Sequence, residues 1–209
     1  MKTLTICTTA LALLLILPSL KPVESLKKSD WVKIFDGKSL AGWKISTEHP
    51  ETFSVKDGAI VVHGERAHLF YEGDLNNHNF KNYEFKATVM TKPGANSGMF
   101  ISTQYQESGW PSAGYEIQVN NSHTDWRRTG SVYAKQDVKE TFVKDNEWYT
   151  EHIIVQGKKI TVKVNDKVIN EYTEPDGESK LGSGTVALQG HDPKSEVWFK
   201  DVMLKVLPD

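Results

Sequence analysis

A period-two alternation of apolar and polar residues from Trp31 onward constrains this chain more than any other feature. Between residues 83 and 89, apolar side chains occupy every odd position and polar side chains every even one. Successive residues of a β-strand point to opposite faces, so the pattern predicts half-buried strands rather than amphipathic helices. The segments that we expect to be extended are 53–55, 60–62, 83–89, 99–105, 115–120, 160–164, 168–172, 186–188 and 197–206.

Tight turns and polar loops separate these segments. Asp57-Gly58 lies between two alternating segments, which is typical of a β-hairpin, and Asn165-Asp166 has the same place later in the chain. The longest loops are expected at 120–129 and 172–184, where Gly, Pro, Asn and Asp collect. Many short strands at regular spacing predict an all-β sandwich or jelly roll. We expect one such domain over residues 26–209.

The N-terminal segment has the features of a secretory signal. Lys2 precedes an apolar run at 11–17, and Pro18 follows it. The run is shorter than the roughly 20 residues that cross a bilayer, so we predict a signal peptide at 1–25 and no membrane span in the mature protein. The expected location is the periplasm or the extracellular space. Cys7, the only cysteine, lies inside this segment, which leaves the mature chain without thiols.

Charge and aromatic content narrow the classes of partner. The 25 Lys and Arg residues nearly balance 27 Asp and Glu residues and are interspersed with them, so no nucleic acid is expected. Six Trp and seven Tyr residues favour carbohydrate, since aromatic rings stack on the apolar faces of sugars. Trp110 and Trp126 lie on expected loops and are candidates for stacking, with Arg127 for hydrogen bonds. Alternatively, each tryptophan fastens its own loop to the sheet.

Residues 115–120 place a polar row on one face of a strand. Glu116, Gln118 and Asn120 lie two residues apart and share a face, which is either a binding surface or an ordinary solvated one. Glycosidases of the usual kind need two carboxyl groups, and amides cannot replace them as acid, base or nucleophile. The row therefore disfavours two-carboxylate hydrolysis, unless Glu84 or Asp192 supplies a second acid from another strand.

Ordered motifs from Trp31 to Leu207 resemble the 3-keto-disaccharide hydrolase family. They are Ile34-Phe35-Asp36-Gly37, Gly42-Trp43, Pro93–Phe100, Gly114–Val119, Thr129–Tyr133, Trp148, Asn165-Asp166, Leu188–His191 and Trp198-Phe199. The resemblance implies a concanavalin A-like jelly roll with a concave ligand-binding face. Two departures concern loop shape and substrate choice: segment 134–140 has no proline, and Lys200-Asp201 stands where Arg-Asn is common.

The resemblance implies cleavage of a 3-keto-glycoside. A ketone at C3 acidifies the hydrogen at C2, so one general base can remove it and the group at C1 leaves, with water added later. On the matching positions, either Glu116 or His191 would be the base. Gln118 and Asn96 would be donors to the developing enolate. Lys135 is a further candidate donor, only because it follows the Thr129–Tyr133 motif, and Asn96 has ordinary turn chemistry as an alternative.

No cofactor is predicted, although a divalent metal could polarise the ketone, with Glu116 and His191 as its ligands. The seven histidines include no spaced helical pair of the kind that zinc hydrolases use. The alternative function is a non-catalytic, lectin-like carbohydrate-binding module, which would use the same face and the same aromatic residues. A structural or adhesion domain also fits the fold, but it leaves the polar row without a purpose.

Overall fold

The computed structural model describes Met1 and residues 30–209. The expected signal peptide, its cleavage site and Cys7 lie outside the described residues, and export stays a prediction. Within the described part of the chain, no helix is long and apolar enough to cross a membrane.

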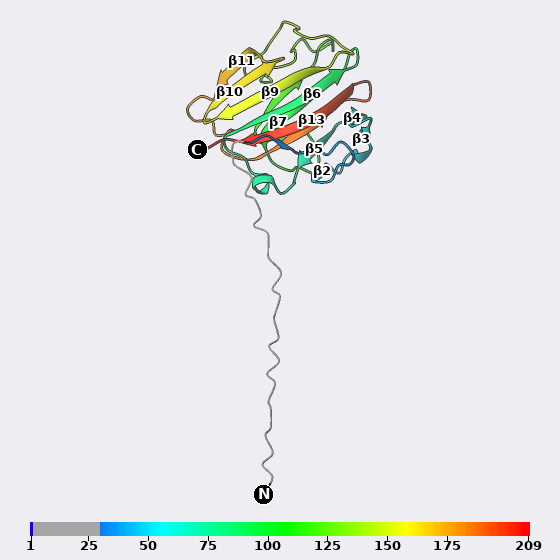
Figure 1. Ribbon diagram of the computed structural model, residues 1–209. Coiled ribbons are helices and arrows are strands. Elements are labelled where there is room, and N and C mark those ends of the chain that lie inside the picture. The colour runs from blue at the N-terminus through cyan, green and yellow to red at the C-terminus, as the bar shows by residue number, and fades with distance from the viewer. Residues whose placement is uncertain (2–29) are drawn as a thin grey trace.

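Two antiparallel sheets pack face to face (Figure 1). The larger sheet has the order β11-β10-β9-β6-β13-β4-β3, with β1 also paired to β13. Its strands are β1 Val32–Lys33, β3 Phe53–Lys56, β4 Ala59–His63, β6 Tyr83–Thr91, β9 Tyr149–Gln156, β10 Lys159–Val164, β11 Lys167–Thr173 and β13 Glu196–Val206. The smaller sheet has the order β2-β5-β12-β7-β8. Its strands are β2 Trp43–Ile45, β5 Ala67–Tyr71, β7 Ser97–Thr103, β8 Tyr115–Val119 and β12 Thr185–Gly190.

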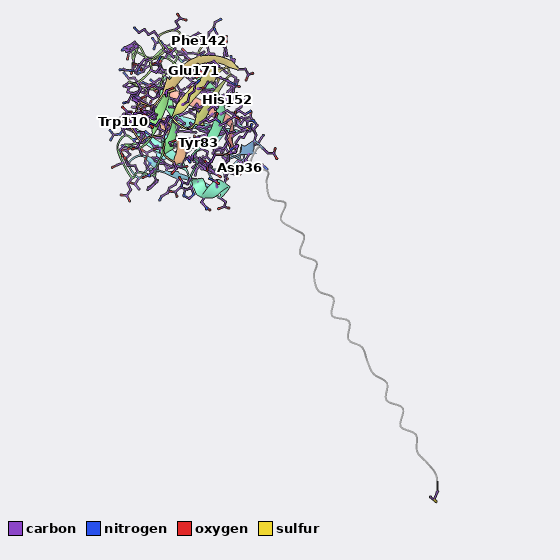
Figure 2. All side chains as sticks on the ribbon, turned by 90° about the vertical axis from the view of Figure 1, so that its left-hand side faces the viewer. Asp36, Tyr83, Trp110, Phe142, His152 and Glu171 are labelled. Atoms are coloured by element: carbon purple, nitrogen blue, oxygen red, sulfur yellow. The ribbon has the colours of Figure 1, made fainter. Side chains whose placement is uncertain are left out.

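Alternating side chains from both sheets form one apolar core. Phe85 and Phe199 enter it from the larger sheet, and Met99, Ile117 and Leu188 enter it from the smaller one; all five are fully buried. Fully burying a side chain of this kind is worth roughly 1.5–3 kcal/mol, so the paired inner faces hold the two sheets together. Figure 2 shows Trp110 and His152 on opposite sides of the buried Tyr83, which places them outside the two sheets.

The all-β sandwich predicted from the alternation is confirmed. The Asp57-Gly58 turn joins β3 to β4, and β6 and β8 occupy the expected segments. Four strands were not predicted, namely the two-residue β1 and the strands β2, β5 and β9. Residues of β5 are buried on both faces, so this strand has no alternation to detect. In β9, Glu151 points inward and disturbs the apolar pattern.

Candidate functional site

A pocket of about 410 Å³ opens on the outer face of the smaller sheet. Along β8, Ile117 and Val119 point into the core. Glu116 and Gln118 therefore point outward into the pocket, and Gln189 does so from β12. The surrounding loops supply the walls. The lining residues are Asn96, Phe100, Trp110, Pro111, Gly114, Tyr115, Glu116, Gln118, Tyr133, Lys135, Lys180, Gln189 and His191.

Glu116 is the only carboxylate among the described residues that line this pocket. Burial raises the pKa of its carboxyl group to about 7, with a smaller contribution from the negative charge of Asp125; a hydrogen bond from the Gln189 amide opposes the rise. A carboxyl group with a pKa near neutrality is both a substantial base and partly ionised at pH 7. The site therefore contains one carboxylate suited to removing a proton.

Gly98 provides the space that the Glu116 side chain occupies. It lies on β7, the strand paired with β8. A Cβ atom at residue 98 would lie 2.7 Å from Oε1 and 2.8 Å from Cγ of Glu116, closer than non-bonded atoms approach. Residue 98 is therefore a glycine because the Glu116 side chain occupies the space of a Cβ atom, and not because the backbone conformation favours glycine.

An amide chain runs from the pocket floor to its rim. The Gln118 side chain donates from Nε2 to Asn96 Oδ1 at 3.0 Å, and Asn96 Nδ2 lies 3.4 Å from His123 Nδ1. Gln118 and Asn96 are both buried, so these contacts hold their amides in fixed directions. The Oε1 atoms of Gln118 and Gln189 are buried without a partner among the described residues. Buried polar atoms normally have partners, so the two oxygens are available to a ligand or to water.

His191 is oriented by its neighbour Asp192. The distance between His191 Nδ1 and Asp192 Oδ2 is 2.8 Å, and Ser195 Oγ donates to the same oxygen at 2.7 Å. Although burial acts in the opposite direction, these hydrogen bonds lower the pKa of Asp192 and keep it ionised. A carboxylate that accepts the Nδ1–H leaves His191 Nε2 to exchange protons, as in other Asp–His pairs. The His191 ring lies 5.5 Å from the Trp110 ring.

Lys135 is held by a cluster of acidic groups beside the pocket. Its Nζ donates to Glu178 Oε1 at 2.8 Å, and this bond raises the pKa of the ammonium group. The Tyr115 hydroxyl lies 2.8 Å from both Glu178 Oε2 and Glu174 Oε1. Glu174 is buried and also accepts the backbone N–H of Lys180 at 2.7 Å. The cluster connects β8 to the loop after β11 and holds the ammonium group of Lys135 at the pocket wall.

A segment of the loop after β8 covers the outer edge of that strand. The backbone N–H of Gln118 donates to Ser131 O, and Gly130 and Tyr133 donate to the carbonyls of Gln118 and Glu116, at 2.9–3.0 Å. Because β8 is at the edge of its sheet, these bonds complete its pairing. The covering segment also brings Tyr133 and Lys135 to the pocket.

Six of the nine candidate site residues line this pocket. They are Glu116, His191, Asn96, Gln118, Lys135 and Trp110. Their functional roles stay predictions.

The structure places Asn120, Trp126 and Arg127 outside the pocket lining. Asn120 is fully buried, and its Nδ2 donates to the carbonyls of Asp125 and Arg127 at 2.9 and 2.7 Å. Its amide therefore stabilises the loop after β8. Because the strand ends at residue 119, the alternation that directs Glu116 and Gln118 into the pocket does not extend to Asn120. Arg127 forms ion pairs with Asp125 and Asp137, and its guanidinium packs on the exposed ring of Trp126.

Of the two suggested second acids, neither lines the pocket. Glu84 is on β6 of the other sheet, where it pairs with His152 at 2.7 Å and Lys205 at 3.1 Å. Asp192 lies beside the pocket and is bonded to His191. The described pocket therefore holds one carboxylate instead of the pair that ordinary glycosidases use.

Sequence reasoning missed Tyr133, Gln189, Lys180, Gly98 and the orienting role of Asp192. Gln189 and His191 are two residues apart at the end of an expected strand, which was a usable signal. Tyr133 ends a motif that was recognised, whereas Lys180 lies in a loop without any pattern.

A metal site was expected, if present, to use Glu116 and His191. Among the described residues, the group spaced to hold a cation is instead His123, His191 and Asp192, with ligand atoms within 4.8 Å of one another. His123 Nδ1 accepts the backbone N–H of Asp125 at 3.0 Å, so the ring proton is on Nε2. Metal-binding histidines usually donate from their second nitrogen, which this contact prevents. The donor set therefore fits a metal poorly.

Comparison with known proteins places this site in a family context. The chain is similar in structure to a "putative glycosyl hydrolase" from Parabacteroides distasonis ATCC 8503, with a TM-score of 0.70 and 21% identity over 85% of this chain and 94% of that one. It is also similar to carbohydrate binding module CBM66 from Bacillus subtilis, with a TM-score of 0.60 and 11% identity over 78% and 95% of the two chains.

A Bacillus subtilis protein with a galectin-like fold gives a TM-score of 0.59, at 10% identity over 84% and 94% of the two chains. At these identities the likeness shows the fold, a lectin-like sandwich. No curated protein matches the chain by sequence. The model of the 3-keto-alpha-glucoside-1,2-lyase-like domain matches residues 30–205, nearly all of the described chain, and this chain therefore belongs to that family.

Proposed function

We propose that the pocket cleaves the glycosidic bond of 3-keto-glycosides by elimination. The observation that carries the proposal is a single lining carboxylate, Glu116, whose pKa burial raises to about 7, in a pocket that also contains His191. A ketone at C3 makes the C2 proton acidic, so one base of this strength is sufficient to start the reaction. Two carboxylates would be needed only if the sugar were unoxidised.

Glu116 takes the proton in the first step. The C2–H bond breaks, the proton goes to the carboxylate, and the electron pair forms an enolate with its charge on the C3 oxygen. Lys135 lines the same pocket and is the donor proposed for that oxygen, whereas Gln118, whose Nε2 donates to Asn96, presents its free Oε1 to a sugar hydroxyl. Losing one such donor typically costs about 10²–10³ in rate. The Lys135 ammonium is held in place by Glu178, which reduces the reorganisation that stabilising the enolate requires.

His191 completes the reaction by protonating the leaving group at C1. The enolate electrons form a C1=C2 double bond as the C1–O bond breaks, and the departing oxygen takes a proton from His191 Nε2. Asp192 accepts the Nδ1–H and stabilises the charged imidazole that donates this proton. The products are an unsaturated 3-keto sugar and the free alcohol, and water adding across the double bond gives net hydrolysis. Trp110, half exposed beside His191, is available to stack on the sugar ring.

The test compares a 3-keto-glycoside with its unoxidised parent, in deuterated water and with or without chelator. We expect cleavage of the keto compound only, deuterium at C2 of recovered substrate or product, and no effect of chelator. Glu116→Gln should reduce kcat/KM about 10²–10⁴-fold, the usual contribution of a general base. His191→Ala should reduce it too.

The matched control is Glu171→Gln, which removes an exposed carboxylate on β11 of the other sheet. Wild-type turnover by Glu116→Gln, or equal cleavage of the unoxidised glycoside, would contradict the mechanism. A lectin-like module is the alternative that the half-exposed Trp110 favours. It would bind both sugars, cleave neither, and show only a modest loss of affinity in Glu116→Gln.

A further inference from the structure

A second pocket, here called the distal pocket, lies at the opposite end of the same sheet. It has a volume of about 360 Å³, within the range of ligand sites, and is lined by Asn77, Asn79, Thr103, Gln104, Tyr105 and Thr185 among others. Thr185 lies four positions before Gln189 of the first pocket along β12, a span of about 13 Å. Neither the family match nor the structural neighbours assign a role to it.

A β-bulge turns Thr103 toward this pocket. Ser102 has a φ of 50°, and the pairing of β7 with β12 shifts so that Phe100 faces Ala187 while Thr103 faces Thr185. One extra residue in β7 thus moves Thr103 to the side of the sheet that carries Phe100. The bulge is held from the core by Tyr83, whose hydroxyl accepts the Ser102 N–H at 2.7 Å. Bulges that redirect a side chain are common next to binding sites.

The Thr103 hydroxyl has an unused hydrogen-bonding capacity. Thr103 is fully buried, and its Oγ1 has no hydrogen-bond partner among the described residues. An unpaired buried hydroxyl costs about 1–3 kcal/mol, so it is normally satisfied by a ligand or by water. Because Thr103 lines the distal pocket, an occupant of that pocket or a bound water is the nearest source of a partner for its hydroxyl.

The remaining lining indicates the chemistry of the occupant. Asn77 has a φ of 52°, as part of three consecutive left-handed residues that include Asn76 and His78. Such strained backbone costs on the order of 1–3 kcal/mol per residue and collects at functional sites. The amides of Asn77 and Asn79 and the ring of Tyr105 form the rim, and the charge of Glu72 is balanced by Lys44 at 3.6 Å.

We infer that the distal pocket binds a neutral saccharide unit. The lining amides and hydroxyls are groups that bind sugar hydroxyls. Lys44 Nζ lies over one face of the Tyr105 ring, 3.5 Å from its centroid, so at most the other face is open to the apolar face of a sugar. The apolar cluster of Phe70, Phe100 and Ala187, against which Tyr105 packs, lies between the two pockets. The saccharide is either the far end of a glycoside that also enters the first pocket or a separate molecule. The inference requires no oxidised sugar and therefore does not depend on the proposed reaction.

The test is an NMR titration of the ¹⁵N-labelled protein with methyl β-glucoside and with cellobiose, neither of which carries a ketone. We expect shifts of the amides at 77–79, 103–105 and 183–185. Saturation of this set alone by the monosaccharide identifies a separate saccharide. Joint saturation with residues 116–118 and 189–191 by cellobiose identifies one ligand that spans both pockets.

Two variants keep the inference falsifiable. Thr103→Val removes the hydroxyl but keeps a β-branched side chain, and it should weaken binding about 3- to 10-fold, the value of one hydrogen bond. Asn77→Gly removes an exposed amide where glycine tolerates the positive φ, and it should weaken binding similarly. Thr161→Val, the same exchange on β10 of the other sheet, is the control. Absence of shifts in the distal set with both sugars, or unchanged binding by both variants, would overturn the inference.

Discussion

Replacing Gly98 by alanine should disable Glu116 without touching it. The added Cβ would lie 2.7 Å from Glu116 Oε1, whereas ordinary contacts begin at 3.4 Å, so the carboxylate must move by at least 0.7 Å. Residue 98 does not have a positive φ, and the conflicting atoms belong to a flexible side chain. The fold should therefore accommodate the methyl group by displacing the base.

Displacing a reacting group by about 1 Å costs up to about 10²-fold in rate. We expect Gly98→Ala to lower kcat/KM on a 3-keto-glycoside by about 10- to 100-fold, with a melting temperature close to that of the wild type. Gly182→Ala is the matched control, because its Cβ would meet only Ser179 O, at 3.8 Å.

A double-mutant cycle separates this explanation from a general disturbance of the sheet. If Gly98→Ala acts through Glu116, it should have almost no further effect in the Glu116→Gln background. Wild-type activity of Gly98→Ala would refute the idea that the position of this carboxylate matters. Equal losses in both backgrounds would refute the claim that the glycine acts through it.

Two further predictions concern charge. The pKa of Glu116 rises from an ordinary 4.5 to about 7, so the folded state favours the protonated form; its contribution to stability is complete below pH 4.5 and is lost as the pH rises through 7. In urea unfolding, the free energy of unfolding of the wild type should fall by up to about 3 kcal/mol between pH 4 and 8, relative to that of Glu116→Gln. The same dependence of this free energy on pH in both proteins would contradict the prediction. Asp192→Asn should lower kcat/KM on a 3-keto-glycoside by about 10²-fold in steady-state assays, since the carboxylate that accepts His191 Nδ1–H at 2.8 Å is lost; unchanged kinetics would remove the Asp–His pair from the mechanism.

The sequence was sufficient for the architecture because local patterns and burial agree along most strands. In β6, the inward residues from Tyr83 to Val89 are all apolar, and the Asp57-Gly58 turn has φ values of 50° and 76°, which this pair tolerates. In β9, by contrast, a buried glutamate interrupts the pattern. Burial raises the pKa of Glu151 well above its ordinary value, a consequence of tertiary packing that no local window contains.

The site was predictable only where a side chain's direction follows from strand alternation. Glu116 and Gln118 belong to β8 and line the pocket, but Asn120 follows the strand end and turns to loop carbonyls. In the sequence, nothing distinguished Trp110 from Trp126 as the residue that stacks on a sugar. Only Trp110 reaches the pocket, because the path of a loop depends on contacts such as Gly109 N–H to Glu48 at 3.2 Å, made across 61 residues.

The segment that covers the edge of β8 has a consequence for variation within the family. Residues 130–133 satisfy the backbone of β8, and Tyr133 and the nearby Lys135 form part of the pocket wall. Unpaired strand edges recruit other chains and promote aggregation. Changes in this segment that broaden the choice of sugar thus risk exposing the edge of β8 and making the protein aggregate. The loop that carries Trp110 does not cover this edge, so changes there do not carry the same risk. We therefore expect new specificities to arise more readily on the Trp110 side.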